Sequence, residues 1–241
     1  MEITDRQKQI LLAIISEFMS SADEVGSVTL VEKYGMDMSS ATVRNEMVKL
    51  MDQGFLEKTH ISSGRFPTDQ ALRLYVRDLL LESRISAIEQ ALVRQDLFRV
   101  RFSKEELIRE ILEILVKHLN CAAFIFTDES SRYFGVSSLM KFEELKNVQT
   151  LQRVLDVLED RNLLSKVFSK YESDEVSLLI GAESGIDDLQ DCAIAFTKIN
   201  LNNKSSDHMG IIGSRRMDYS KVIPLLKSIR ESVEVSLRGW R

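Results

Sequence analysis

The stretch SSATVRNEMVKL at residues 39–50 has the pattern of a short amphipathic helix. A serine at its start, Ser39 or Ser40, is suited to cap it, because a serine hydroxyl accepts a hydrogen bond from an unpaired amide of the first turn. At 100° per residue, the apolar residues gather on one side. This side is predicted to face a core and consists of Val43, Met47, Leu50 and Met51.

The opposite side of this helix is small, polar and basic. It carries Ala41, Thr42, Asn45 and Lys49, with Arg44 on the flank. Small residues allow close approach to DNA, polar side chains bond to base edges, and cations bind phosphates. The side is therefore suited to the major groove, although an ordinary solvated helix face would show the same pattern.

The neighbouring segments favour a DNA-binding interpretation. Apolar residues at spacings of three and four predict helices over residues 5–21 and 27–34. Behind the third helix, residues 55–59 and 65–68 have the composition of two short strands around Ser62-Ser63-Gly64. Three helices followed by a two-stranded wing form the winged variant of the helix-turn-helix.

Base contacts are predicted for Thr42, Arg44 and Asn45, and phosphate contacts for Lys49 and Arg65. The wing tip is expected to contact the phosphate backbone or the minor groove. The complete predicted DNA-binding set is Ser39, Ser40, Thr42, Arg44, Asn45, Lys49, His60, Ser62, Ser63, Arg65 and Thr68.

The charge distribution restricts the basic surface to one segment. The 241-residue chain has a formal net charge of −5. Residues 1–38 hold three basic and seven acidic side chains, whereas residues 39–77 hold six basic and four acidic. We therefore expect weak binding to DNA unless the site is specific or two copies add their contacts.

Long ungapped segments in the first eighty residues resemble the heat-shock repressor family HrcA. They are DRQKQILLAIISEFM (5–19), EVGSVTLVEKYGMDMSSATVRNEMVKLMDQGFLEKTHISSGRFPTD (24–69) and LRLYV (72–76). The resemblance implies a repressor of chaperone operons in the stress response, bound as a homodimer to an inverted-repeat operator in double-stranded DNA. It also implies that a GroEL-type chaperonin keeps the repressor competent.

The second half alternates strand and helix patterns, which predicts an α+β fold. A helix over residues 104–119, capped by Ser103, has an apolar arc so wide that it should be buried against a sheet or a second subunit. Segments 132–151, 178–196 and 210–226 resemble the GAF-like domain of HrcA. The expected organisation is a winged-helix DNA-binding domain (1–80), a helical linker (81–103) and a GAF-like domain (104–241).

Typical family members carry a dimerisation domain between segments equivalent to CAAFIFT (121–127) and RYFGVSS (132–138). Here only four residues, 128–131, separate these segments. The chain therefore resembles a short form of the family. A substitute dimer surface is expected on the apolar helix 104–119, with the C-terminal helix as a second element.

Enzymatic and metal chemistry are not indicated. His60, His118 and His208 lie far apart in the sequence and do not form a cluster of Cys and His at metal-ligand spacing. There is no P-loop, nucleotide fingerprint or nucleophile elbow. We therefore expect no catalytic residue, no metal and no cofactor, and an acidic surface loop at ESGIDDLQD (183–191) in preference to a cation site.

The expected location is the cytoplasm. No window approaches the roughly 18–20 continuous apolar residues of a membrane span, and the start MEITDRQKQ has no secretion signal. Cys121 and Cys192 both stand in apolar, strand-like runs, which indicates buried, reduced thiols.

Two other functions compete with the repressor. In the first, the GAF-like half binds a small ligand and changes the geometry of the DNA-binding half, which predicts a sizeable, partly polar pocket there. In the second, the same half is an enzyme tethered to DNA, and the sequence offers no catalytic constellation for it.

Overall fold

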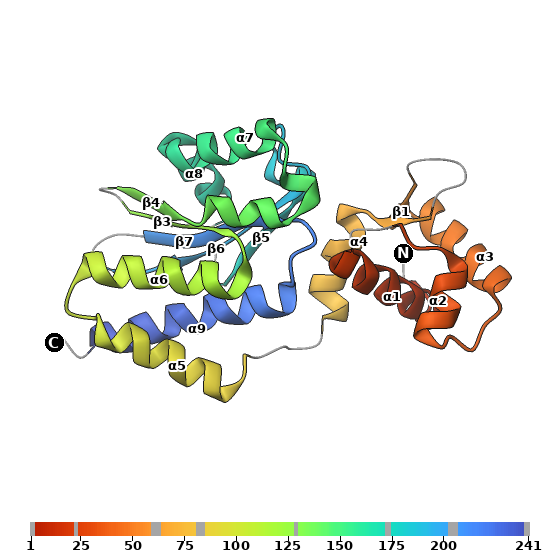
Figure 1. Ribbon diagram of the computed structural model, residues 1–241, viewed down its shortest axis with the longest axis horizontal. Helices are drawn as coiled ribbons and strands as arrows, with labels where there is room; N and C mark the ends of the chain where they lie inside the picture. The colour runs from red at the N-terminus through yellow and green to blue at the C-terminus, as the bar shows by residue number, and fades with distance from the viewer. Residues whose placement is uncertain are drawn as a thin grey trace. The chain divides into compact units, whose positions relative to one another are not determined.

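The computed structural model describes residues 3–21, 24–58, 64–80, 85–127, 130–171, 175–201 and 207–238. The chain divides into two compact units, Met1–Glu82 and Ser83–Arg241 (Figure 1). The first unit is mainly helical with a small sheet, and the second combines a five-stranded sheet with helices. This composition confirms the predicted α+β class. No helix in the described part of the chain is long and apolar enough to cross a membrane.

Three helices form the core of the first unit, as the apolar spacing predicted. They are α1 (Asp5–Ser21), α2 (Ser27–Tyr34) and α3 (Ser40–Asp52). Each contributes fully buried aliphatic side chains, among them Ile10, Leu11, Ile14, Leu30, Val43 and Leu50. Strands β1 (Leu56–Glu57) and β2 (Phe66–Pro67) pair antiparallel behind α3 and form the base of the wing.

An isolated bridge joins the wing to the segment between α1 and α2. Val25 and Arg65 exchange two backbone hydrogen bonds, each of 3.1 Å. Beside this bridge, a Cβ on Gly64 would lie 2.7 Å from the backbone of Glu24 and of Val25. Only glycine fits there without a shift of the backbone, so Gly64 fixes the position of the wing base.

The sequence TDQALRLYVRDLLLESR (68–84) predicts one continuous helix after the wing, but the observed helix ends at Leu79. It consists of α4 (Asp69–Leu74) and a π-helical turn (Tyr75–Leu79). The amide of Leu80 bonds to the carbonyl of Tyr75, and Leu80 itself is extended with ψ 105°. Tyr75 and Val76, which the apolar spacing places on the inward side of this helix, are only half-buried. The helix therefore ends where its apolar face no longer has a core to cover.

The second unit is built on an antiparallel sheet with strand order β4-β3-β7-β6-β5. Helices cover both of its faces (Figure 1). The strands are β3 (Ala122–Phe126), β4 (Ser131–Phe134), β5 (Ser177–Ile180), β6 (Cys192–Ile199) and β7 (Asp207–Ser214). The helices are α5 (Ala87–Arg99), α6 (Lys104–Leu119), α7 (Val148–Glu159), α8 (Arg161–Lys170) and α9 (Tyr219–Arg238), with 3-10 turns at Val136–Lys141, Glu143–Leu145 and Gly181–Ser184.

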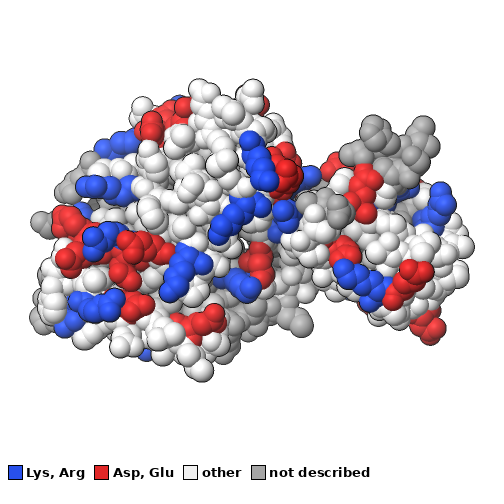
Figure 2. Space-filling model, in the orientation of Figure 1, with Lys and Arg blue, Asp and Glu red and all other residues white. Residues whose placement is uncertain are grey.

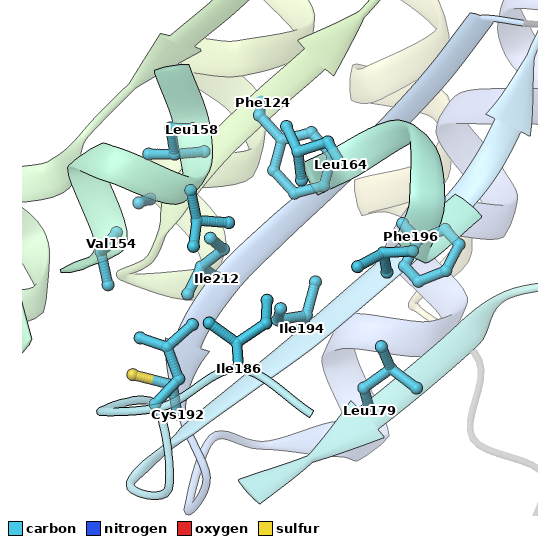
Figure 3. Packing of buried hydrophobic residues seen from close by; sticks show 14 of the residues in the cluster. Phe124, Val154, Leu158, Leu164, Leu179, Ile186, Cys192, Ile194, Phe196 and Ile212 are labelled. Carbon is cyan, nitrogen blue, oxygen red and sulfur yellow. The ribbon is translucent and has the colours of Figure 1, made fainter. Parts of the chain in front are cut away.

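The space between the sheet and helices α7 and α8 is filled by a hydrophobic core (Figure 3). At its centre, the ring of Phe168 lies 5.0 Å from that of Phe196 and 6.0 Å from that of Phe124. The alternate residues of the strands, such as Ile125 and Ile211, are buried on the other face of the sheet. Both faces are therefore covered, which explains the continuous apolar runs of these strands.

Helix α6 packs on that other face of the sheet, beside β3, β4 and α9. Seven of its eight apolar residues are buried within the second unit, and the eighth, Val116, is half-buried. The wide apolar arc is thus explained by packing against the sheet. The predicted use of this arc as a dimer surface is wrong, because its apolar side chains are already covered.

Helix α5 lies in the segment predicted to be a linker. Ser86 and Glu89 begin it with a capping box, in which each side chain bonds to the backbone of the other residue. Val93 and Leu97 are buried where α5 packs against α6 and α9. Tertiary packing therefore continues the helix to Arg99, although the helical periodicity of the sequence weakens from residue 94, and α5 belongs to the second unit.

Candidate DNA-binding site

Helix α3 begins at a well-formed cap. Ser39 is extended, and its hydroxyl oxygen accepts a hydrogen bond of 3.1 Å from the amide of Thr42. The hydroxyls of Ser39 and Thr42 are also 2.9 Å apart and hydrogen-bonded to each other. The cap fixes the first turn, so the exposed side chains that follow are presented from a rigid helix.

The predicted core side of α3 is confirmed for Val43, Met47 and Leu50, which are buried. Met51 is half-buried. On the opposite side, Ala41, Arg44, Asn45, Val48 and Lys49 are exposed, whereas Ser40 and Thr42 are half-buried. The structure therefore brings the predicted base-contacting residues onto one surface of one helix.

Glu46 is a residue whose place the sequence analysis did not identify. It is buried, and its carboxylate accepts a hydrogen bond of 2.8 Å from the ammonium of Lys49. This bond lowers the pKa of Glu46, although partial burial acts in the opposite direction, and Gln7 of α1 adds a second hydrogen bond. Lys49 is therefore held in place and partly neutralised, so its phosphate contact should be weaker than its charge suggests.

Val48 is the second residue that the sequence analysis missed. Its side chain is 43% exposed on the surface that also carries Asn45. Its position was recoverable, because residues three and seven apart share a helix face and Val48 follows Asn45 by three and Ala41 by seven. An exposed apolar side chain at this place is suited to the methyl group of thymine.

The wing is described only in part. Arg65 lies at the bridge to Val25, and its guanidinium donates a hydrogen bond of 3.0 Å to the carbonyl of Gly64. The predicted tip residues His60, Ser62 and Ser63 lie outside the described residues. Their contacts with DNA therefore stay predictions.

Thr68 has a structural role in the first unit. Its hydroxyl donates a hydrogen bond of 2.7 Å to the carbonyl of Gly54, just after α3, and accepts one of 3.3 Å from the amide of Ala71. Thr68 thus caps α4 and ties it to the end of α3. A direct contact of Thr68 with DNA remains a prediction.

The second unit offers a surface pocket of about 650 Å³ between α6 and the edge strand β4. Its lining mixes acidic and basic residues with the apolar side chains of Ile108, Leu112 and Phe134. Lys and Arg are likewise interspersed with Asp and Glu on the face of this unit shown in Figure 2. The pocket therefore has no dominant sign of charge to select a ligand.

Neither histidine in the described part of the chain points to a metal site. His118 stands in the last turn of α6, and the ring of His208 stacks on that of Phe168 at 4.3 Å. Among the described residues, no group of three or more His, Cys, Asp or Glu could hold a metal ion. Cys121 and Cys192 are free and buried, and burial raises the pKa of both thiols, that of Cys192 to about 12.

Comparison with known proteins identifies the family. The family model described as "HrcA protein C terminal domain" matches residues 37–223. The chain belongs to the HrcA family. A heat-inducible transcription repressor HrcA from Clostridium perfringens (strain 13) is 25% identical in an alignment 339 positions long. This alignment covers 98% of this chain and 99% of that protein. The repressor HrcA from Fusobacterium nucleatum is 26% identical over 327 residues, with 97% and 93% covered.

The HrcA alignments also show that this chain is short. The alignment with the Clostridium perfringens relative is 339 residues long, whereas this chain has 241, so the relative holds segments without a counterpart here. A crystal structure titled as that of a hypothetical protein has the same fold. Its TM-score is 0.82, with 16% identity and 99% of both chains covered.

Proposed function

We propose that this HrcA family member is a sequence-specific DNA-binding repressor of heat-shock genes that acts as a homodimer on an inverted-repeat operator. The observation that carries the proposal is α3, which is capped by Ser39, buried on one side and exposes Arg44, Asn45 and Val48 on the other. The relatives that align with nearly the whole chain are heat-inducible transcription repressors.

Repression in this account is a binding event and needs no catalytic step. Helix α3 enters the major groove with its exposed side. Asn45 is suited to bond to adenine and Arg44 to guanine, since these side chains match the donor and acceptor pattern of those bases. Lys49 and Arg65 neutralise phosphates, and the wing follows the backbone beside the groove.

A dimer is part of the proposal because one copy has few cations near α3. Arg44 and Lys49 are the basic residues of this helix, and Lys49 is paired with Glu46. The chain as a whole is acidic, with a net charge of −5. Two copies on a two-fold operator double the contacts and convert the second binding step into an intramolecular one.

The family resemblance alone supports a GroEL-type chaperonin as a partner and the cytoplasm as the location. In this scheme the chaperonin keeps the repressor competent, and stress releases the operon by occupying the chaperonin. Retention of chaperonin by immobilised unfolded repressor, but not by folded repressor, is the expected result. Equal retention by both forms would contradict the scheme.

A gel-shift titration tests the proposed function. The probe is DNA from upstream of the chaperonin operon of the same genome, with a scrambled inverted repeat as control, at two salt concentrations. The proposal predicts tight binding that requires both half-sites and weakens with salt. Binding that is indifferent to the repeat, with or without chaperonin, would contradict it.

The pocket between α6 and β4 favours a second candidate, a repressor controlled by a small ligand. Its volume of about 650 Å³ falls within the usual range of ligand sites. The core between the sheet and helices α7 and α8 is packed with side chains. A ligand in the surface pocket would raise the melting temperature and change operator affinity, and a screen that shows neither effect would exclude this candidate.

A further inference from the structure

Helix α5 exposes an apolar surface that its own unit does not cover. Ile88 is 74% exposed, Leu92 and Phe98 are each 53% exposed, and Phe102, just beyond the helix, is 69% exposed. We call these four residues the α5 outer face. The opposite side of α5 is held by buried Val93 and Leu97. A helix that is apolar on both sides is normally buried on both, and clustered exposed apolar residues mark an interaction surface.

The apolar residues of the α5 outer face are spaced symmetrically about its centre, so their spacing is the same in both chain directions. Ile88 and Leu92 are four residues apart, and so are Phe98 and Phe102. Gln95 is exposed midway between Leu92 and Phe98. A two-fold axis at Gln95 would place the aliphatic pair of one copy against the aromatic pair of the other. Self-complementarity of this kind is what an isologous dimer requires.

The aromatic end of the face is already organised. The guanidinium of Arg101 lies 3.5 Å from the ring centroid of Phe98 and 3.9 Å from that of Phe102. It also donates a hydrogen bond to the carbonyl of Phe98. Both rings are therefore held by one cation, which lowers the conformational entropy that binding of a partner would have to remove.

Charge favours an antiparallel contact between two copies. Glu89 stands at the start of α5, whereas Arg99 stands at its end and Arg101 just beyond it. Between them, Arg94 and Asp96 carry opposite charges, and Asp96 lies 3.6 Å from Arg99. An antiparallel pair places the acidic end of each copy beside the basic end of the other. The positive end of each helix dipole then also lies beside the negative end of the other. A parallel pair would bring like charges together.

We propose that the α5 outer face is the surface through which two copies of this chain associate, antiparallel across a two-fold axis at Gln95. The inference rests on the proposed function, because it supplies the homodimer that an inverted-repeat operator needs. It also explains how a chain shorter than its relatives could pair, given that the apolar side of α6 is covered within its own unit.

A matched pair of variants of the full chain tests the surface. Ile88→Glu adds a charge to the α5 outer face, and Val148→Glu adds the same charge on α7, where Val148 is 72% exposed. Both positions lie in the first turn of a helix, where a carboxylate is compatible with folding. In sedimentation velocity, Ile88→Glu should weaken dimerisation at least about tenfold, and Val148→Glu should leave it unchanged.

Cross-linking tests the axis. In Gln95→Cys the two new thiols should face each other, and a disulfide forms when the Cα atoms are within about 7 Å. Diamide takes up the two electrons and two protons that are released. Cys121 and Cys192 are buried, so they should not compete. Gln152→Cys, at an exposed position of α7, is the control, and Gln95→Cys should cross-link much faster.

The outcomes separate this inference from the proposed function. A wild-type dimer that Ile88→Glu does not weaken, or in which Gln95→Cys cross-links no faster than the control, would overturn the α5 interface and leave the repressor in place. A dimer that passes both tests but shows no preference for an inverted repeat would support the interface and contradict the repressor. A chain that stays monomeric on operator DNA would contradict both.

Discussion

The ammonium of Lys49 lies 2.8 Å from the carboxylate of Glu46, one turn earlier on the helix proposed to enter the major groove. Glu46 is nearly enclosed, whereas the side chain of Lys49 is mostly exposed. In the proposed complex, Lys49 is therefore shared between Glu46 and a phosphate of the DNA.

Glu46→Gln should tighten DNA binding. The variant keeps the shape of the side chain but removes the charge that competes for Lys49, so the lysine is released to phosphates. We expect an increase in affinity of roughly two- to tenfold for operator and unrelated DNA alike, with a steeper dependence on salt. Anisotropy titrations at several salt concentrations measure both quantities. An increase restricted to operator DNA would contradict the assignment of Lys49 to the backbone.

The same pair should make stability depend on pH in the acid range. The hydrogen bond from Lys49 lowers the pKa of folded Glu46 below its ordinary value of 4.5. A group with a lowered folded pKa contributes stability that is present above its unfolded pKa and is lost as the pH falls through the folded pKa. The difference in unfolding free energy between wild type and Glu46→Gln should therefore be constant near neutral pH and shrink in acid. Urea titrations across this range measure it, and a constant difference down to the lowest pH would contradict the ion pair.

Val48→Ala should reduce the part of the operator affinity that depends on a thymine methyl group. Removing the exposed methyl groups of Val48 should cost about 1 kcal/mol, or roughly fivefold in operator affinity. Replacing thymine by deoxyuridine in the operator removes the methyl group on the DNA side. The replacement should weaken binding by wild type more than binding by Val48→Ala. Equal losses for the two proteins would show that Val48 does not contact a thymine methyl group.

Gly64→Ala should destabilise the first unit. The added Cβ would lie 2.7 Å from the backbone of Glu24 and Val25, so the bridge to the wing must move. We expect a loss of about 1–3 kcal/mol. Gly26→Ala is the matched control, because its Cβ would meet only the hydroxyl of Thr29 at 3.8 Å and its cost is limited to the lower preference for alanine at the N-cap of α2. Thermal unfolding of both variants measures the effect, and equal melting temperatures would contradict the close approach at Gly64.

The sequence was sufficient for elements whose pattern is decided locally. The bounds of α2 and α6 agree with the prediction, since each helix has a clear apolar period. The capping role of Ser39 followed from the residue type and its place before an apolar stripe. Much of the winged-helix unit and of the sheet could therefore be predicted before the structure.

Other features depend on contacts that a single sequence does not display. The continuation of α5 to Arg99 depends on the burial of Val93 and Leu97 against distant helices. The pairing of Glu46 with Lys49 depends on a buried position for a residue type that is usually exposed. In both cases tertiary packing overrides the local pattern.

The central claim is that the exposed side of α3 binds specific bases, and Asn45→Ala tests it most directly. Asn45 is exposed on that side, and Gln9→Ala, which removes an exposed amide on α1, is the matched control. Affinity is measured by anisotropy on the operator and on variants with single base changes in each half-site. We predict that Asn45→Ala loses about 1–3 kcal/mol and no longer distinguishes one base position, while Gln9→Ala binds as wild type does. Unchanged affinity and unchanged base preference for Asn45→Ala would contradict the claim.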